Sequence, residues 1–160
     1  MLTSVRLQSA TNGSPSPPFP GGSSDPFVRD GVSLTFLIVE DEAAIALDLQ
    51  SIIMDAGGQV LGMAATASDA ERLAYALRPD IILMDVRLRG ERDGIAAAHA
   101  IRTQLDTTIV FVTGNEDLDT VARIMATSGG PPVHRPIRPR GLIEAALTAL
   151  RCDRKKTPSQ

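Results

Sequence analysis

The chain has 160 residues, enough for one domain with a full hydrophobic core, and a formal net charge of −3. This small negative charge gives no reason to expect direct binding to nucleic acid or to an anionic membrane. The one cysteine, Cys152, excludes an internal disulfide and favours a reducing compartment. Because the sequence has no long apolar run and no N-terminal signal pattern, we expect a cytoplasmic protein.

The two ends of the chain differ in composition from its middle. Residues 1–32 include a Pro/Gly/Ser-rich stretch from Asn12 to Ser24 that has almost nothing to bury, which predicts a disordered tail. Residues 152–160 are predicted to form a short polar tail. The folded domain is therefore expected to span residues 33–151.

Within that domain, short apolar runs alternate with segments of helical periodicity. The predicted strands are Leu34–Val39, Gln59–Ala64, Ile81–Met84, Thr108–Val112 and Pro132–His134. The predicted helices are Ala43–Ala56, Ser68–Leu77, Gly94–Leu105, Asp117–Ser128 and Arg138–Leu150. A capping-box pattern, Ser68 with Glu71, marks the start of the second helix. Five such βα units with nearly all-apolar strands predict a doubly wound α/β fold with a parallel sheet.

Polar residues follow four of the five predicted strands. Glu40 and Asp41 follow the first strand, Asp85 the third, Thr113 the fourth and Arg135 the fifth. Ligand sites in open α/β sheets lie beyond the carboxyl ends of the strands, so we expect these side chains to converge. Clustered carboxylates repel one another unless a cation lies among them. The pattern therefore predicts a divalent metal site with one carboxylate left over for chemistry.

Other charged residues near these positions have simpler interpretations. Glu42 is predicted to be a carboxylate at a helix N-terminus. His99 and His134 lack metal-ligand spacing and are interpreted as structural or exposed. The three arginines of the 86–94 loop either form a solvated face or raise the positive potential beside the site.

Taken together, four motifs resemble the receiver domain of two-component response regulators. They are Leu37-Ile38-Val39-Glu40-Asp41-Glu42, Ile82-Leu83-Met84-Asp85 with Asp93-Gly94, Val112-Thr113-Gly114, and Arg135-Pro136-Ile137. Each motif alone is weak, but their order and their places at strand ends are specific, and the resemblance covers about residues 34–150. It implies a CheY-like (βα)5 three-layer sandwich whose five-stranded parallel sheet has the flavodoxin-like order 2-1-3-4-5.

The resemblance also implies the chemistry of the site. Asp85 would accept a phosphoryl group from a phosphohistidine on a sensor histidine kinase or a histidine phosphotransfer protein. Mg²⁺ would be held by Glu40, Asp41, Asp85 and the backbone carbonyl of Arg87. Oxygen ligands of this kind suit Mg²⁺, which would neutralise the carboxylates and the phosphoryl oxygens.

Three positions bear on how the family's switch would work in this chain. Thr113 matches the switch hydroxyl that hydrogen-bonds the phosphoryl group. Arg135 stands where the family nearly always has lysine, and Pro132 where it often has an aromatic. The 86–94 loop is one residue longer than in many members and lacks their proline. Because arginine and lysine are not interchangeable, Arg135 is expected to alter either the rate or the switching.

The resemblance implies a stand-alone receiver that signals to a downstream protein. Its output would be a changed surface on the fourth helix, fifth strand and fifth helix, about Asp117–Leu150, since the ten residues after Leu150 are too few for a DNA-binding module. We expect a phosphoacceptor with self-catalysed phosphorylation and dephosphorylation only, not an enzyme. No nucleic acid or membrane partner is expected, and the sequence leaves a homodimer open.

Two alternatives belong to other classes of function. A phosphorylation-independent interaction module is suggested by Arg135 and Pro132. A Mg²⁺-dependent aspartyl-phosphate phosphohydrolase would use Asp85 as nucleophile, but such enzymes usually carry a second aspartate where this chain has Arg87. A nucleotide-binding protein is disfavoured because the first strand is followed by acidic residues in place of a glycine-rich phosphate loop.

Overall fold

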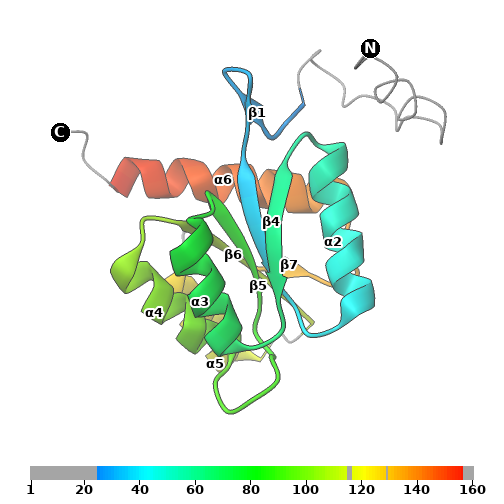
Figure 1. Ribbon diagram of the computed structural model, residues 1–160. Coiled ribbons are helices and arrows are strands. Elements are labelled where there is room, and N and C mark those ends of the chain that lie inside the picture. The colour runs from blue at the N-terminus through cyan, green and yellow to red at the C-terminus, as the bar shows by residue number, and fades with distance from the viewer. Residues whose placement is uncertain (1–24, 115–116, 129, 157–160) are drawn as a thin grey trace.

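The molecule is built on a five-stranded parallel sheet (Figure 1). The computed structural model describes residues 25–114, 117–128 and 130–156. The strands are β3 (Thr35–Val39), β4 (Gln59–Ala64), β5 (Ile81–Asp85), β6 (Thr108–Thr113) and β7 (Val133–His134), in the spatial order β4-β3-β5-β6-β7. In chain order this is 2-1-3-4-5, so the predicted flavodoxin-like fold is confirmed.

Helices cover both faces of the sheet (Figure 1). Helices α2 (Ala43–Asp55) and α6 (Pro139–Lys156) pack on one face, and α3 (Ala67–Leu77), α4 (Gly94–Gln104) and α5 (Leu118–Thr127) pack on the other. A helix between consecutive parallel strands is the connection that such a sheet requires. The result is the three-layer arrangement expected from the alternation of apolar runs and amphipathic segments.

Side chains of the central strands divide between two hydrophobic cores. On β3, Phe36 and Ile38 face the α2–α6 layer, whereas Leu37 and Val39 face the α3–α5 layer. All four are buried. Burial on both faces explains why these strands read as continuous apolar runs rather than as an alternating pattern.

A short hairpin precedes the sheet, in a segment that the sequence assigned to the tail. Strands β1 (Val28–Arg29) and β2 (Val32–Ser33) pair antiparallel. Between them Asp30 and Gly31 have φ values of 52° and 79°, the left-handed conformation of a tight hairpin turn. The tail boundary predicted at residue 32 is therefore wrong for this segment.

The hairpin is held by Phe27, whose side chain is fully buried in the α2–α6 core. Its ring centroid lies 4.8 Å from that of Phe36, and its backbone N–H donates to the carbonyl of Ala56 at 2.9 Å. One aromatic residue in a polar stretch thus extends the domain at its N-terminal side. The remainder of the predicted tail, residues 1–24, lies outside the described residues.

The C-terminal helix also extends further than predicted. α6 continues to Lys156, six residues beyond the predicted end at Leu150, so most of the predicted polar tail is helical. On this extension Asp153 is buried, and its Oδ1 lies 3.1 Å from Nη2 of Arg102 on α4. A buried ion pair thus holds a segment that composition alone marks as polar and exposed. Residues 157–160 lie outside the described part.

The start of α3 is a further difference from the predicted boundaries. The side-chain oxygen of Thr66 accepts a hydrogen bond from the N–H of Asp69 at 3.1 Å, so Thr66 is the N-cap and the helix begins at Ala67. The predicted capping box of Ser68 with Glu71 is wrong. By contrast, the predicted start of α4 at Gly94 agrees with the structure. Within the described residues, no helix is long and apolar enough to cross a membrane.

Candidate functional site

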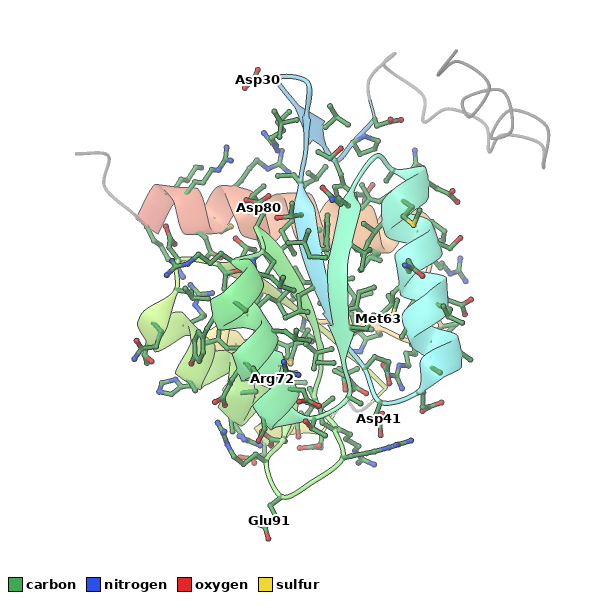
Figure 2. The ribbon with its side chains drawn as sticks, viewed as in Figure 1. Asp30, Asp41, Met63, Arg72, Asp80 and Glu91 are labelled. Atoms are coloured by element: carbon green, nitrogen blue, oxygen red, sulfur yellow. The ribbon has the colours of Figure 1, made fainter. Side chains whose placement is uncertain are left out.

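The candidate site is a cleft of about 470 Å³ at the carboxyl ends of the strands. It is lined by Asp41, Glu42, Asp85, Arg87, Thr113, Gly114 and Arg135. Figure 2 places Asp41 at one end of the molecule and Asp30, in the N-terminal hairpin, at the other. The structure thus brings together the polar strand-end residues that the sequence singled out, on the edge opposite to the hairpin.

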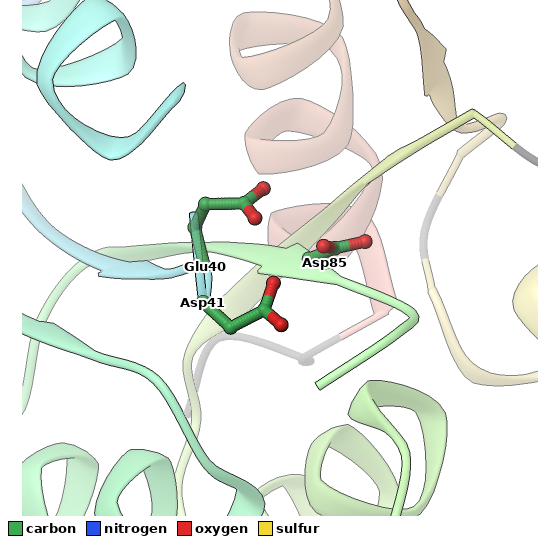
Figure 3. A group of neighbouring side chains, drawn as sticks. All are labelled: Glu40, Asp41 and Asp85. Carbon is green, nitrogen blue, oxygen red and sulfur yellow. The ribbon is translucent and has the colours of Figure 1, made fainter. Parts of the chain in front are cut away.

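Three carboxylates form the acidic part of the site (Figure 3). One oxygen each from Glu40, Asp41 and Asp85 lies within 4.8 Å of the others. Glu40 and Asp85 are only 4% and 5% exposed, whereas Asp41 is partly exposed. Buried carboxylates this close require a positive partner, and their oxygen atoms suit a hard divalent cation such as Mg²⁺.

The backbone at the strand ends fixes the directions of these carboxylates. The N–H of Glu40 donates to the carbonyl of Ala64 at 2.9 Å, which continues the pairing of β3 with β4 by one residue. Oε1 of Glu40 accepts from the N–H of Glu42 at 3.1 Å. In the same way, Oδ1 of Asp85 accepts from the N–H of Arg87 at 3.2 Å. Each buried carboxylate is therefore held by the first turn of the loop that follows it.

Arg135 supplies a positive charge that contacts the carboxylates of the cleft. Its Nη2 lies 2.5 Å from Oε2 of Glu40 and 3.1 Å from Oδ2 of Asp85. One terminal nitrogen thus bridges a carboxylate from β3 and a carboxylate from β5. The sequence predicted a cation at this position, but not that its shorter contact is with Glu40 and its longer one with Asp85.

Glu40 has an unusual protonation equilibrium. Burial raises the pKa of Glu40 from 4.5 to about 7, and the nearby charge of Asp85 acts in the same direction. The hydrogen bond from the N–H of Glu42 and the charge of Arg135 oppose this rise in pKa. Near neutral pH, the ionised form that a metal requires therefore competes with the protonated form.

Thr113 and Gly114 form the wall of the cleft at the end of β6. Thr113 is 1% exposed, and its carbonyl accepts from the N–H of Arg135 at 3.2 Å, which joins β6 to the segment after β7. Beside it, a Cβ added to Gly114 would lie 3.9 Å from Cδ of Arg135, so the glycine leaves this side of the cleft open. Thr113 and Arg135 are thus coupled through the backbone as well as through their shared cleft.

The loop after Asp85 is pinned at two points. Nη2 of Arg92 lies 2.5 Å from Oε1 of Glu71 on α3. Oδ2 of Asp93 lies 2.9 Å from Nη2 of Arg123 on α5, while Oδ1 of Asp93 caps α4 by accepting from the N–H of Ala96. Of the loop arginines, Arg92 therefore pairs with a helix. The ion pair of Asp93 with Arg123 has no signal in the sequence pattern.

Gly94 has a role that the sequence did not predict. A Cβ at Gly94 would lie 1.8 Å from the carbonyl oxygen of Asp85, and the N–H of Gly94 donates to the carbonyl of Val86 at 2.7 Å. Only glycine permits this approach of the loop to the backbone of Asp85. The Asp93-Gly94 pair therefore serves the site as well as the start of the helix.

The two histidines lie outside the acidic cluster. His99 on α4 and His134 on β7 are both exposed, in agreement with their interpretation as structural or exposed residues. Among the described residues, the group of acidic, histidine or cysteine side chains that could hold a metal ion is the one formed by Glu40, Asp41 and Asp85.

Comparison with known proteins gives a consistent result. The family model of the response regulator receiver domain matches residues 36–147. The chain is 33% identical over 114 residues to the transcriptional regulatory protein PdtaR of Mycobacterium tuberculosis, covering 71% of this chain and 55% of that protein. It is also 33% identical over 78 residues to the phyllosphere-induced regulator PhyR of Methylorubrum extorquens, covering 48% of this chain and 29% of PhyR. The chain thus spans about half the length of PdtaR and less of PhyR.

A solved structure agrees with these sequence relatives. The signal receiver domain of a modulated diguanylate cyclase from Desulfovibrio desulfuricans has a TM-score of 0.71 and 29% identity, covering 77% of this chain and 98% of that domain. The family match extends over most of the sheet and its helices. On these grounds, the chain belongs to the family of response regulator receiver domains of two-component signalling.

Proposed function

We propose that this receiver domain takes a phosphoryl group on Asp85 from a phosphohistidine donor. The observation that carries the proposal is the position of Asp85, buried at the end of β5 and open to a cleft that also contains Thr113 and Arg135. One oxygen of Asp85 would form the new bond to phosphorus, while the bond from phosphorus to the donor nitrogen breaks and the imidazole keeps the electron pair. The donor would be a sensor histidine kinase or a histidine phosphotransfer protein.

Mg²⁺ would be held by Glu40, Asp41, Asp85 and the backbone carbonyl of Arg87. The three carboxylates fit this role because their oxygens lie within 4.8 Å of one another and two of them are buried. When bound, the ion would supply positive charge that offsets the charge of the carboxylates and of the transferring phosphoryl group. Since Glu40 has a raised pKa, the ion and a proton would compete for it.

Thr113 and Arg135 would contact the phosphoryl group from the ends of β6 and β7. A threonine hydroxyl donates one hydrogen bond, and a guanidinium offers several donors in a planar fork that matches phosphate oxygens. Both residues line the cleft beside Asp85. We therefore assign Thr113 as the switch hydroxyl and Arg135 as the cation that takes the place of the usual lysine.

The signal would reach a downstream protein through the surface of α5, β7 and α6. Thr113 directly precedes the segment leading to α5, and Arg135 directly follows β7, so a movement of either residue lies at the border of this surface. Phosphorylation would then shift the population between two arrangements of one fold. PdtaR and PhyR are both named as regulators, which supports an output of this kind.

Phosphoryl uptake is tested with acetyl phosphate and Mg²⁺, followed by intact mass or Phos-tag electrophoresis. The wild type should gain one phosphoryl group only with Mg²⁺, and Asp85→Asn should gain none. Asp48→Asn is the matched control, because Asp48 is an exposed aspartate on α2 and its loss should leave phosphorylation unchanged. If a folded wild type gains nothing from acetyl phosphate or from phosphotransfer proteins, the proposal is wrong.

A second candidate is a receiver that binds its partner without phosphorylation. The observation favouring it is the contact of Arg135 with both Glu40 and Asp85, which offsets part of the negative charge of the acidic cluster. Pro132 favours it too, since the aromatic part of the usual switch is absent. In that case Asp85→Asn would leave partner binding unchanged, whereas the first proposal predicts that phosphorylation changes it.

A further inference from the structure

An acidic cleft lies at the edge of the sheet away from the candidate site. It has a volume of about 360 Å³, and Asp80, Asp106 and Asp153 line it together with Arg154. Asp80 and Asp106 stand before β5 and β6, and Asp153 is on α6. Figure 2 places Asp80 on the side of the N-terminal hairpin and Asp41 at the other end of the molecule. The carboxylates of this cleft are therefore separate from the cluster that would hold Mg²⁺.

A basic cleft of about 300 Å³ lies where the C-terminal parts of α4, α5 and α6 meet. His99 and Arg102 line it from α4 and Lys156 from α6, while α5 contributes Met125, whose side chain is 51% exposed. Because the carbonyl ends of helices carry partial negative charge, a small anion is disfavoured between three of them. Basic side chains beside exposed apolar area are instead typical of a surface that contacts another protein.

A buried ion pair separates the two clefts and fixes their spacing. Nη2 of Arg102, in the basic cleft, lies 3.1 Å from Oδ1 of Asp153, in the acidic cleft, and the two side chains are 27% and 8% exposed. Because these two charges are already matched to each other, those of Asp106 and Lys156 remain for another molecule. Both residues are exposed, and neither has an ion-pair partner among the residues that the structure describes.

Two clefts of opposite charge at a fixed spacing are complementary to a second copy of themselves. A two-fold rotation that exchanges two copies places the acidic cleft of each opposite the basic cleft of the other, so the same charges are matched twice. Lysine suits such a contact, because its ammonium group stands at the end of a flexible chain of four carbons. Met125 would add apolar area to the contact.

We propose that two copies of this chain associate through these clefts, with Lys156 of each copy in the acidic cleft of the other, beside Asp106. The N-terminal ends of β5 and β6, where this acidic cleft lies, are outside the surface of α5, β7 and α6 assigned above to a downstream protein. Each exposed charge pair contributes little, so the association is weak and sensitive to salt. The inference stands apart from phosphoryl transfer and from the metal site.

Sedimentation equilibrium over a range of protein concentrations measures the association of the wild type, Asp106→Lys and Lys156→Glu. Each variant places like charges at both contacts of the two-fold interface, so we expect its dissociation constant to rise by about tenfold or more. Added salt should also weaken the wild-type dimer. Both substituted side chains are exposed, and far-ultraviolet circular dichroism checks that the variants fold.

An equimolar mixture of Asp106→Lys and Lys156→Glu tests the pairing directly. In the mixed dimer the two substituted side chains attract each other, and so do the native Asp106 and Lys156, so association should return. Asp48→Lys mixed with Lys156→Glu is the matched control, because Asp48 is an exposed aspartate on α2. This control mixture has the same total charge but keeps one repulsive contact, so it should associate more weakly.

Three results would overturn the proposal. One is a wild type that stays monomeric up to millimolar concentration. Another is a dimer that both single variants leave unchanged, since it would then form through a different surface. The third is a mixture of Asp106→Lys and Lys156→Glu that fails to associate although each variant alone has lost its dimer. None of these results depends on Asp85, Mg²⁺ or a phosphoryl donor.

Discussion

Replacing Gly94 by alanine should destabilise the domain through a contact with the backbone of Asp85. The added Cβ would lie 1.8 Å from the carbonyl oxygen of Asp85, whereas real Cβ contacts essentially never fall below 3.0 Å. The partner is backbone at the end of a central strand, so the loop would have to retreat by more than an ångström. That retreat would also lengthen the hydrogen bond from the N–H of Gly94 to the carbonyl of Val86.

The expected cost is the sum of two effects. Overpacking a dense site costs about 1–3 kcal/mol, and weakening one buried hydrogen bond about 1 kcal/mol, so we expect the free energy of unfolding to fall by about 2–4 kcal/mol. Urea denaturation followed by far-ultraviolet circular dichroism measures it, which suits a chain without tryptophan.

Gly141→Ala is the matched control for this prediction. A Cβ at Gly141 meets no atom within 4 Å, and the residue lies in α6, so alanine there should stabilise the protein by up to about 1 kcal/mol. The two substitutions add the same methyl group at helical positions but should have opposite signs. A Gly94→Ala variant as stable as the wild type would refute the packing argument.

Three further predictions concern protonation, the hairpin and a helix cap. Because burial raises the pKa of Glu40 to about 7 in the folded chain, folded protein binds this proton more tightly than unfolded protein, so metal-free stability should fall as pH rises from about 4.5 to about 7. Glu40→Gln should remove this dependence of stability on pH, as measured by urea denaturation across the same pH range. Phe27→Ala should lower the free energy of unfolding by about 3–5 kcal/mol, whereas Val32→Ala, at a side chain 69% exposed, should change it by less than about 0.5 kcal/mol. Thr66→Ala should lower the free energy of unfolding by about 1 kcal/mol, whereas Ser68→Ala should leave it almost unchanged. The opposite order of the two effects would support the predicted capping box of Ser68 with Glu71.

The sheet could be predicted from the sequence because each central strand is a short run of apolar residues. Phe36–Val39 and Ile81–Met84 are buried on both faces, and that environment leaves a clear compositional trace. The ends of these apolar runs also mark the ends of the strands, and so identify the polar residues that converge there. The convergence of these polar residues then follows from the topology, since parallel strands place all their carboxyl ends on one edge.

Features that depend on a single long-range contact could not be predicted in this way. Phe27 lies in a polar segment, and only its packing against Phe36 shows that the domain includes it. The last turns of α6 are stabilised by the ion pair of Asp153 with Arg102, which are 51 residues apart in sequence. No local periodicity records such partners, so composition assigned both segments to tails.

The details of the site fall into the same class. The sequence identifies Arg135 as a nearby cation, but the shorter contact with Glu40 depends on how the loops after β3 and β7 meet. Likewise, the requirement for Gly94 comes from a backbone atom of Asp85 rather than from any pattern around the glycine. Residue types and order thus predict which groups meet, while their exact pairings depend on the three-dimensional arrangement.

The carboxylate of Asp93 joins three parts of the molecule, since it caps α4, lies in the loop after Asp85 and pairs with Arg123 of α5. Helix α5 and the loop after Asp85 are therefore connected by one side chain. Thermodynamic linkage makes such a connection work in both directions. If ion binding in the cleft moves α5 through this side chain, a protein that prefers one position of α5 changes the ion affinity of the cleft by the same factor by which the ion changes its own affinity.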